Sequence, residues 1–382
     1  MDFDLNDEQR LLQESLGKLL ADHYGFEQRA AMLGGDPGWS RDMWARYAEM
    51  GLLALPFSVE DGGMDGGPVD TMIVMEAFGG ALVLEPYLST VILCGSLLRH
   101  GASDTQRSAL IAKIADGGLL MAFAQGERQS RYDLFDVATT ARRDGSGFVL
   151  DGAKTVVLGG DSADRLIVSA RTAGDRRDPN GIGLFLVDVE AAGVSRRGYA
   201  TQDGHRAAEI VLDGVRVDEA DVLGDPEGAL PVIERAVEET IAALCAEAVG
   251  TMARMHAETV EYLKVRKQFG VPIGSFQVLQ HAAVDMFVDL EQARSMAMFA
   301  AMMAGEADAA VRGPAISAAK VQIGQSGKAV GQAAIQLHGG VGMTMEFQVG
   351  HYFKRATMID QTFGNVAYHL ARAGGGDSLV AA

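Results

Sequence analysis

The stretch LPVIERAVEETIAALCAEAVGTMARMHAETVEY, residues 230–262, sets the main constraint on the fold. Its apolar side chains recur every three or four residues, which is the spacing of one face of an α-helix. At 1.5 Å per residue, such a helix is roughly 50 Å long, a length typical of a helical bundle. The apolar positions are Leu230, Ile233, Val237, Ile241, Leu244, Ala248, Met252 and Met255.

Two more helical patterns follow along the chain. The first covers about residues 276–303, and the second, about residues 315–337, is rich in Ala and Gly, whose small side chains let helices pack closely. Residues 374–382 are predicted to form a loose tail. The C-terminal part is therefore predicted to be helical up to that tail.

The first third of the chain also carries helix signals. Asn6 and Gln9 have the spacing of a capping box, and apolar residues follow at helical intervals. Ser40 is a suitable cap for a second helix that Gly51 would end. Helical patterns resume over about residues 70–114, so this part is predicted to be helical as well.

The pattern changes near Leu119 to short β-rich runs bounded by Gly, Asp or Asn. Asp151-Gly152 and Asp213-Gly214 each separate two such runs, and each pair predicts a hairpin. Close spacing of strands and turns favours an antiparallel sheet or barrel over alternating strands and helices. The runs are residues 148–150, 155–158, 166–168, 184–187, 210–212 and 215–217.

The order of helices, strands and helices predicts an α+β protein in three parts. We place the parts at residues 1–118, 119–224 and 225–382, in keeping with a usual domain size of ~150 residues. A chain of 382 residues is long enough to bury a large core without disulfides or metals.

Composition excludes several classes of function. The 51 acidic and 33 basic residues give a net charge of −18, which disfavours binding to nucleic acids and to anionic membranes. Cys94 and Cys245 alone cannot form a disulfide framework or a cysteine zinc site, and the eight histidines lack metal-ligand spacing. With no basic leader at residues 1–4 and no long apolar run, we expect a soluble, cytoplasmic protein without a metal.

Common catalytic motifs are missing. The sequence has no P-loop and no G-x-S-x-G elbow, and Gly339-Gly340-Val341-Gly342 does not fit a dinucleotide fingerprint. Composition and spacing alone therefore leave the function open.

Two C-terminal segments nevertheless resemble a known family. Val265-Arg266-Lys267-Gln268-Phe269-Gly270 and residues 336–343, QLHGGVGM, are similar to the flavin-binding C-terminal segments of acyl-CoA dehydrogenases. Residues 5–20, 51–63, 150–154 and 215–224 resemble other segments of that family in the same order. The resemblance covers nearly the whole chain.

The resemblance implies a helical N-domain, a β-barrel-like middle domain and a C-terminal four-helix bundle, with FAD held between domains and across a subunit interface. It also implies α,β-desaturation of an acyl-CoA thioester. In that reaction a carboxylate removes the proton beside the thioester carbonyl, and hydride leaves the β-carbon for the flavin. A backbone N–H and the ribityl chain of the flavin meet the carbonyl oxygen.

Three residues match family positions that contact the FAD of a neighbouring subunit. Arg266 matches the arginine that reaches the FAD diphosphate, for which a guanidinium is well suited. Phe269 and Gln277 match positions along the adenosine part. The alternatives are a solvated charge at a helix end, a buried aromatic ring and a surface amide.

Gln336, Gly339 and Gly340 match the segment that approaches the FAD diphosphate and adenosine region. Glycine allows a close approach of the backbone to a ligand. The alternative is that the glycines only end a helix. A helix end at these glycines is also compatible with the flavin contact.

The contacts that the family makes within one chain look thinner here. Glu127 aligns with a Glu of the middle-domain motif, but Gly126 stands at its threonine position and Arg128 at its proline position. Val156 stands where the family has an aromatic residue, typically Trp, and Leu158 where it has a Thr that contacts the flavin. A change from Trp to Val removes a large stacking surface.

The position of the catalytic base also departs from the family pattern. Alignment puts Thr362 at the position of the catalytic Glu, and a neutral hydroxyl cannot remove that proton at neutral pH. Its backbone N–H would still be available to the thioester carbonyl. Glu239, next to a second base position of the family at Thr240, and Asp360 are weak substitutes, for which a solvated carboxylate is the favoured alternative.

This combination resembles the atypical small subunits of heteromeric acyl-CoA dehydrogenases. The hypothesis is a chain that serves the FAD of a partner in a homo- or heterotetramer, with an acyl-CoA substrate and electron-transfer flavoprotein as acceptor. A catalytically silent stabilising subunit, a self-sufficient homotetramer with a relocated base, and a related flavin oxidase stay open. Dicarboxylic or steroid-derived acyl groups are candidate substrates by resemblance.

Overall fold

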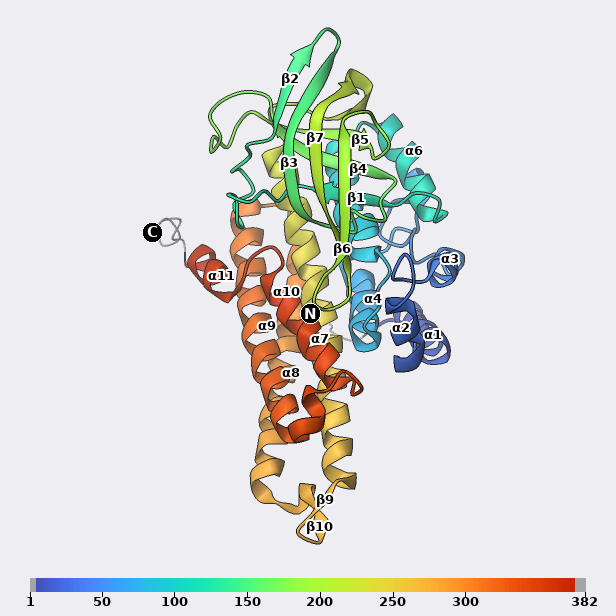
Figure 1. The fold of residues 1–382 in the computed structure, drawn as a ribbon, viewed down its shortest axis with the longest axis vertical. Coiled ribbons are helices and arrows are strands. Elements are labelled where there is room, and N and C mark those ends of the chain that lie inside the picture. The colour runs from blue at the N-terminus through green and yellow to red at the C-terminus, as the bar shows by residue number, and fades with distance from the viewer. Residues whose placement is uncertain (1–4, 375–382) are drawn as a thin grey trace. The chain divides into compact units, whose positions relative to one another are not determined.

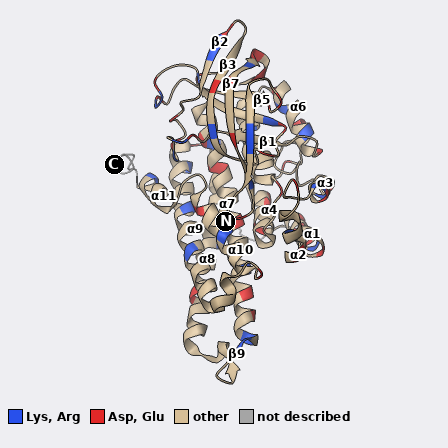
Figure 2. Ribbon diagram, in the orientation of Figure 1, with Lys and Arg blue, Asp and Glu red and all other residues tan. Residues whose placement is uncertain are grey.

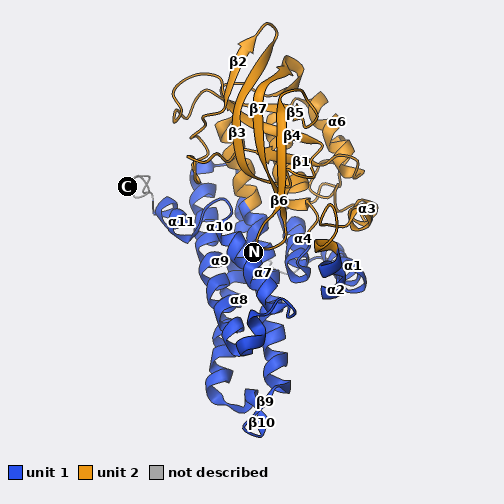
Figure 3. Cartoon of the chain, in the orientation of Figure 1, with its two compact units in different colours: residues 1–31, 68–83, 241–382 blue, residues 32–67, 84–240 orange. Residues whose placement is uncertain are grey.

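The computed structural model describes residues 5–374, which group into two compact units (Figure 3). The first unit combines residues 1–31, 68–83 and 241–382, and the second combines residues 32–67 and 84–240. The predicted boundaries after residues 118 and 224 are not tested by this grouping and stay a prediction. Residues 375–382 of the predicted tail lie outside the described residues.

The first unit is built from helices of both chain ends. Three long helices run along it as antiparallel neighbours, with a small hairpin at one end of the bundle (Figure 1). Its elements are α1 (Asp7–His23), α2 (Phe26–Leu33, in this unit up to residue 31), α4 (Pro68–Ala81), α7 (Leu230–Val265, in this unit from residue 241), β9 (Lys267–Gln268), β10 (Val271–Pro272), η4 (Ile273–Ser275), α8 (Gln277–Ala304), α9 (Ala309–His338), η5 (Gly339–Met343), α10 (Val349–Gln361) and α11 (Val366–Ala373).

The predicted helices are confirmed to within a few residues. Asn6 and Gln9 form the expected capping box at the start of α1. The pattern over residues 276–303 corresponds to α8, shifted by one residue. Helix α9 begins six residues before the predicted start, because Asp308 caps it and Pro314 lies within its N-terminal part.

Two glycines let α4 and α7 cross in close contact. A Cβ at Gly79 would lie 1.9 Å from the backbone oxygen of Glu247, and a Cβ at Gly250 would lie 1.9 Å from that of Glu76. No other residue fits at that spacing without a backbone shift. The N-terminal helix α4 is thereby built into the C-terminal bundle.

The second unit contains the middle sheet. Its strands are β1 (Met121–Ala124), β2 (Thr140–Asp144), β3 (Gly147–Leu158), β4 (Arg165–Arg171), β5 (Ile182–Asp188), β6 (Val194–Ala200), β7 (Arg206–Asp218) and β8 (Val222–Leu223). Its helices are α3 (Arg41–Glu49), η1 (Val59–Asp61), η2 (Leu88–Cys94), α5 (Gly95–Gly101), α6 (Asp104–Ala115) and η3 (Glu219–Asp221), followed by the first part of α7. Ser40 caps α3 as predicted.

Within the described residues the strands form an eight-stranded sheet of order β6-β7-β3-β2-β4-β5-β8, with β1 paired to β4. The pairing is antiparallel except at β1–β4 and β2–β4. One apolar cluster on the inner face, including Leu150, Phe185 and Ile210, forms the core of this unit. The predicted antiparallel sheet and α+β class are confirmed.

The two predicted hairpins at the Asp-Gly pairs are wrong. β3 and β7 each run straight through their pair, and the ladder between them shifts register from Leu150–Val215 to Gly152–Leu212. Asp213-Gly214 therefore forms a β-bulge opposite Asp151, whose carboxylate accepts the N–H of Gly214 at 2.8 Å. A local Asp-Gly signal does not tell a turn from a bulge when a long partner strand is available.

A buried ion pair ties α10 to α7 in the first unit. Nε and Nη2 of Arg355 donate to the two carboxylate oxygens of Glu247 at 2.6 and 2.7 Å, and both side chains are buried. Removing one partner of such a pair leaves the other charge buried and uncompensated.

We expect Arg355→Met to lower the free energy of unfolding by about 3–5 kcal/mol, measured by urea denaturation. Arg10→Met, which breaks an exposed pair with Asp7 on α1, serves as the control and should change it by less than about 1 kcal/mol. Equal effects of the two substitutions would contradict the importance of the buried pair.

Candidate functional site

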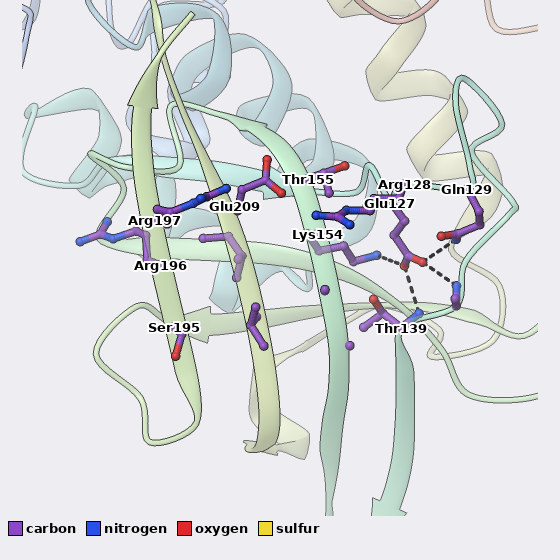
Figure 4. Close-up of a pocket in the computed structure, with 15 residues that line it drawn as sticks. Glu127, Arg128, Gln129, Thr139, Lys154, Thr155, Ser195, Arg196, Arg197 and Glu209 are labelled. Carbon is purple, nitrogen blue, oxygen red and sulfur yellow. Dashed lines mark hydrogen bonds and ion pairs between the residues drawn. The ribbon is translucent and has the colours of Figure 1, made fainter.

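A pocket of about 570 Å³ opens on the face of the sheet formed by β3, β7 and β6 (Figure 4). The loop after β1 closes one side of it and supplies Glu127, Arg128 and Gln129. Four basic and two acidic side chains line the pocket, and none of the lining residues is aromatic. Its lining is Glu127, Arg128, Gln129, Ala138, Thr139, Gly152, Ala153, Lys154, Thr155, Ser195, Arg196, Arg197, Glu209, Ile210 and Val211.

A buried ion pair fixes the loop that closes this pocket. The ammonium of Lys154 donates to Oε1 of Glu127 at 2.7 Å, and the backbone N–H groups of Ala138 and Thr139 donate to the same carboxylate. Burial alone would raise the pKa of Glu127, but the charge and hydrogen bond of Lys154 lower it to about 2. Burial lowers the pKa of Lys154 to about 8, with Glu127 opposing that change.

Val156, at the predicted flavin-stacking position, lies on a second bulge. The register between β3 and β7 shifts from Lys154–Ile210 to Val157–Ala208, so that Thr155 and Val156 face Glu209 alone. Val156 has a φ of +51° and is 52% exposed. A β-branched residue in the left-handed region is strained, and strain of this kind is typical of functional sites.

Thr362 ends α10 and directs its polar groups into the helix. Its backbone N–H donates to the carbonyl oxygens of Met358 and Ile359 at 3.0 and 3.2 Å, and its hydroxyl donates to that of Met358. The prediction that this N–H is available to a thioester carbonyl is therefore wrong for this structure. Among the described residues, the Oδ1 of Asp360 is buried without a hydrogen-bond partner, and its Oδ2 accepts from Gln361.

Two buried side chains hold the turn that contains Thr362. The ammonium of Lys320, on α9, donates to the carbonyl oxygens of Ile359, Asp360 and Gly364 at 2.6–3.0 Å. Nε2 of His369 lies 3.1 Å from the oxygen of Phe363. Burial, helped by the charge of Lys320, lowers the pKa of His369 to about 3, so this imidazole is neutral. Neither residue is predicted from the sequence, because nothing in the sequence pairs them with this turn.

Glu239, on the part of α7 in the second unit, is fully occupied by donors. Arg99, His100, Arg235 and Ser96 all contact its carboxylate at 2.6–2.9 Å. Burial would raise the pKa of Glu239, but the His100 hydrogen bond and the charge of Arg99 lower it to about 2. A carboxylate this acidic and this strongly paired is a poor general base near neutral pH.

Arg266, Phe269 and Gln277 lie together at the hairpin end of the bundle. Phe269 and Gly270 form the two-residue turn between β9 and β10, with φ values of +54° and +82°. Phe269 is 91% exposed, and its ring meets that of Phe276 in an edge-on arrangement with ring centres 6.1 Å apart. Arg266 and Gln277 are also exposed, and no hydrogen bond of the described residues engages the Arg266 guanidinium.

Gln336, Gly339 and Gly340 lie at the C-terminal end of α9, which runs antiparallel to α8 and so ends near the hairpin end of the bundle. Gln336 is exposed, and a Cβ on either glycine would meet no atom within 4 Å. The ring of His338, just before them, stacks on Tyr262 with centres 4.5 Å apart. The structure thus places all six predicted FAD-contacting residues on the exposed end of one helical bundle.

Two further observations concern the described residues as a whole. They contain no helix that is long and apolar enough to cross a membrane. They also contain no group of three His, Cys, Asp or Glu side chains arranged to hold a metal ion. Cys94 and Cys245 are buried and unbridged.

Comparison with known families decides the assignment. Models of the N-terminal, middle and C-terminal domains of acyl-CoA dehydrogenases match residues 6–118, 122–215 and 230–373. The chain belongs to the acyl-CoA dehydrogenase family. The resemblance seen at residues 265–270 and 336–343 is confirmed, and with it the expected reaction class, an oxidoreductase acting on CH–CH groups of acyl-CoA.

Individual relatives agree with this assignment. Acyl-CoA dehydrogenase FadE12 of Mycobacterium tuberculosis is 28% identical over 313 residues, or 81% of this chain and 80% of that protein. The probable acyl-CoA dehydrogenase YngJ of Bacillus subtilis is 28% identical over 370 residues, or 94% and 95%. A solved variant of the Tcur3481-Tcur3483 steroid ACAD is 26% identical, covers 97% of both chains and has a TM-score of 0.86.

In this acyl-CoA dehydrogenase, we expect Val156→Asn to raise the free energy of unfolding by about 1 kcal/mol, because Asn tolerates the left-handed φ that strains Val. Val211→Asn is the matched control, since Val211 is 46% exposed on β7 without a positive φ, and it should lower stability. Urea denaturation measures both. A loss of stability in both variants would rule out strain at Val156.

We further expect Glu239→Gln to destabilise this dehydrogenase by about 2 kcal/mol at pH 7. The pKa of Glu239 is lowered on folding, so its charge contributes stability above its ordinary pKa of 4.5. The difference between wild type and variant should hold down to about pH 5 and shrink as the pH falls toward 2. Glu261→Gln, at an exposed pair on α7, is the control; a pH-independent difference for Glu239→Gln would contradict the pairing.

Proposed function

We propose that this chain is an FAD-dependent acyl-CoA dehydrogenase subunit that completes a shared flavin site with a partner chain. The main support for the proposal is the exposure of Arg266 and Phe269 at the hairpin. Its aromatic ring is almost fully exposed and its guanidinium is unpaired within the described residues. An exposed ring on a strained turn costs free energy that contact with a ligand or a second chain recovers.

The chemistry of these residues fits the adenosine diphosphate end of FAD. A guanidinium donates in a fixed fork to phosphate oxygens, and an aromatic ring packs against a base or a ribose. The open space around Gly339 and Gly340 lets a ligand approach the backbone closely. FAD, when bound, supplies the acceptor for the hydride that leaves the β-carbon of the acyl group.

The rest of the reaction depends on a second chain in this proposal. Thr362 has no acidic group, and the carboxylate of Glu239 is occupied by cationic and hydroxyl donors. No aromatic residue lines the pocket at the predicted in-chain flavin position. A partner would therefore supply the base and the stacking surface. The paired name of the Tcur3481-Tcur3483 steroid ACAD supports this arrangement and favours a steroid-derived acyl-CoA among the candidate substrates.

A catalytically silent role is the second candidate function. It is favoured by the same occupied Glu239 and by the turn around Thr362, whose backbone is held by Lys320 and His369. In that case the partner alone would bind FAD and desaturate, and this chain would raise only the stability of the complex. Electron-transfer flavoprotein as acceptor and a cytoplasmic location remain part of the proposal by family resemblance.

The test is to purify the chain alone and together with a candidate dehydrogenase partner. We expect the lone chain to lack stoichiometric flavin absorbance and desaturation, and the complex to show both. Arg266→Gln in this chain should weaken FAD binding to the complex at least about tenfold, because a charge-assisted phosphate contact is lost.

Lys264→Gln, two residues earlier on α7, removes the same charge from an exposed pair and is the matched control. Neither substitution should change the melting temperature of the lone chain, since both side chains are exposed. A lone chain that binds FAD fully and desaturates a thioester would overturn the shared-site proposal. A partner that is equally active without this chain would overturn the shared site and support the catalytically silent role.

A further inference from the structure

The pocket on the sheet contains two guanidinium groups without partners. Among the described residues no hydrogen bond or ion pair engages Arg128 or Arg197. Figure 4 shows Arg197 extending from β6 and Arg128 from the loop after β1, toward the same stretch of β3 and β7. Figure 2 shows basic residues on β6, in a chain whose net charge is −18. Unpaired arginines that converge on one pocket of an acidic protein indicate an anion site.

No ion pair among the described residues joins either charge to an acidic side chain, although Glu209 lies directly opposite Arg197 in the β6–β7 ladder. Lys154 and Glu127 neutralise each other, and Arg196 directs one end of its guanidinium to the carbonyl oxygens of Gly160 and Ala163. Glu209 is the remaining acidic group. Its Oε1 accepts from the hydroxyl of Tyr199 at 3.0 Å and forms no ion pair among the described side chains.

We propose that Arg128 and Arg197 bind the diphosphate of an adenosine nucleotide at this face of the sheet, in place of a stacked flavin ring. The exposed Val156 bulge leaves no aromatic surface for a ring, whereas two guanidinium groups provide charge and several donors for phosphate oxygens. The inference concerns this chain's own pocket and rests on the proposed function only for the source of the nucleotide. FAD and acyl-CoA both carry such a diphosphate.

The test uses the full-length chain and isothermal titration with inorganic pyrophosphate, CoA and FAD. We expect pyrophosphate to bind, with an affinity that falls as salt rises. Arg128→Gln and Arg197→Gln should each weaken binding about tenfold, the equivalent of about 1.4 kcal/mol. Glu209→Gln should strengthen it, because a nearby negative charge is removed.

Arg142→Gln is the matched control, because Arg142 is an exposed arginine of β2 outside the pocket lining. Equal weakening by this control would show nonspecific attraction and overturn the site, as would the absence of pyrophosphate binding. Arg128 and Arg197 are exposed and unpaired among the described residues, so the melting temperatures of both variants should match that of the wild type. Matching melting temperatures exclude unfolding as the cause of weaker binding.

The two nucleotide arms distinguish the source of the diphosphate. If CoA binds and FAD does not, the pocket takes the substrate; if FAD binds through its diphosphate, its fluorescence anisotropy rises while its absorbance spectrum stays that of free FAD. An FAD spectrum that shifts on binding and is unaffected by pyrophosphate would overturn the proposal in favour of a stacked ring. Because none of these readings needs desaturation, the site can stand even if the shared-flavin function fails.

Discussion

The buried pair of Lys154 and Glu127 is the interaction on which the middle sheet depends. The ammonium lies inside the sheet, where it also contacts the backbone oxygen of Gln125 and the hydroxyl of Ser169. The carboxylate of Glu127 in turn accepts hydrogen bonds from the backbone N–H groups of residues 138 and 139. One ion pair therefore joins two loops to β3. Loss of either charge would leave the other buried and uncompensated in the interior of the protein, where an isolated charge is unfavourable. Both residues line the pocket, and the strand that carries Lys154 bulges two residues further on, at Val156.

The turn at residues 359–364 is held by buried side chains from outside it. The buried ammonium of Lys320 contacts three carbonyl oxygens of the turn, and the buried imidazole of His369 contacts a fourth. Burial lowers the pKa values of both side chains. Phe363 and Gly364 adopt positive φ values there. Such an arrangement is costly unless the turn itself is used. The proposed role beside a partner chain would give the turn such a use.

Much of this fold could be predicted from the sequence because helical periodicity is local. The apolar spacing from Leu230 onward and the capping box at Asn6 each depend on residues a few positions apart. The Asp-Gly pairs were misleading, since the choice between a hairpin and a bulge depends on a strand about sixty residues away. The same limit applies to the candidate site. The exposure of Phe269 and the occupied state of Glu239 depend on the tertiary structure, and no pattern along the chain indicates that Arg99 and Arg235 meet on one carboxylate.

The glycine crossing of α4 and α7 has a consequence for how the protein is made. Helix α4 is apolar on nearly all sides, and Ile73, Val74 and Met75 are buried in the finished molecule. The ribosome completes it long before residues 241–265 exist. At a typical elongation rate that interval is roughly ten seconds or longer, during which the nascent helix has no α7 to cover it. The final packing of α4 therefore waits until most of the polypeptide has been translated.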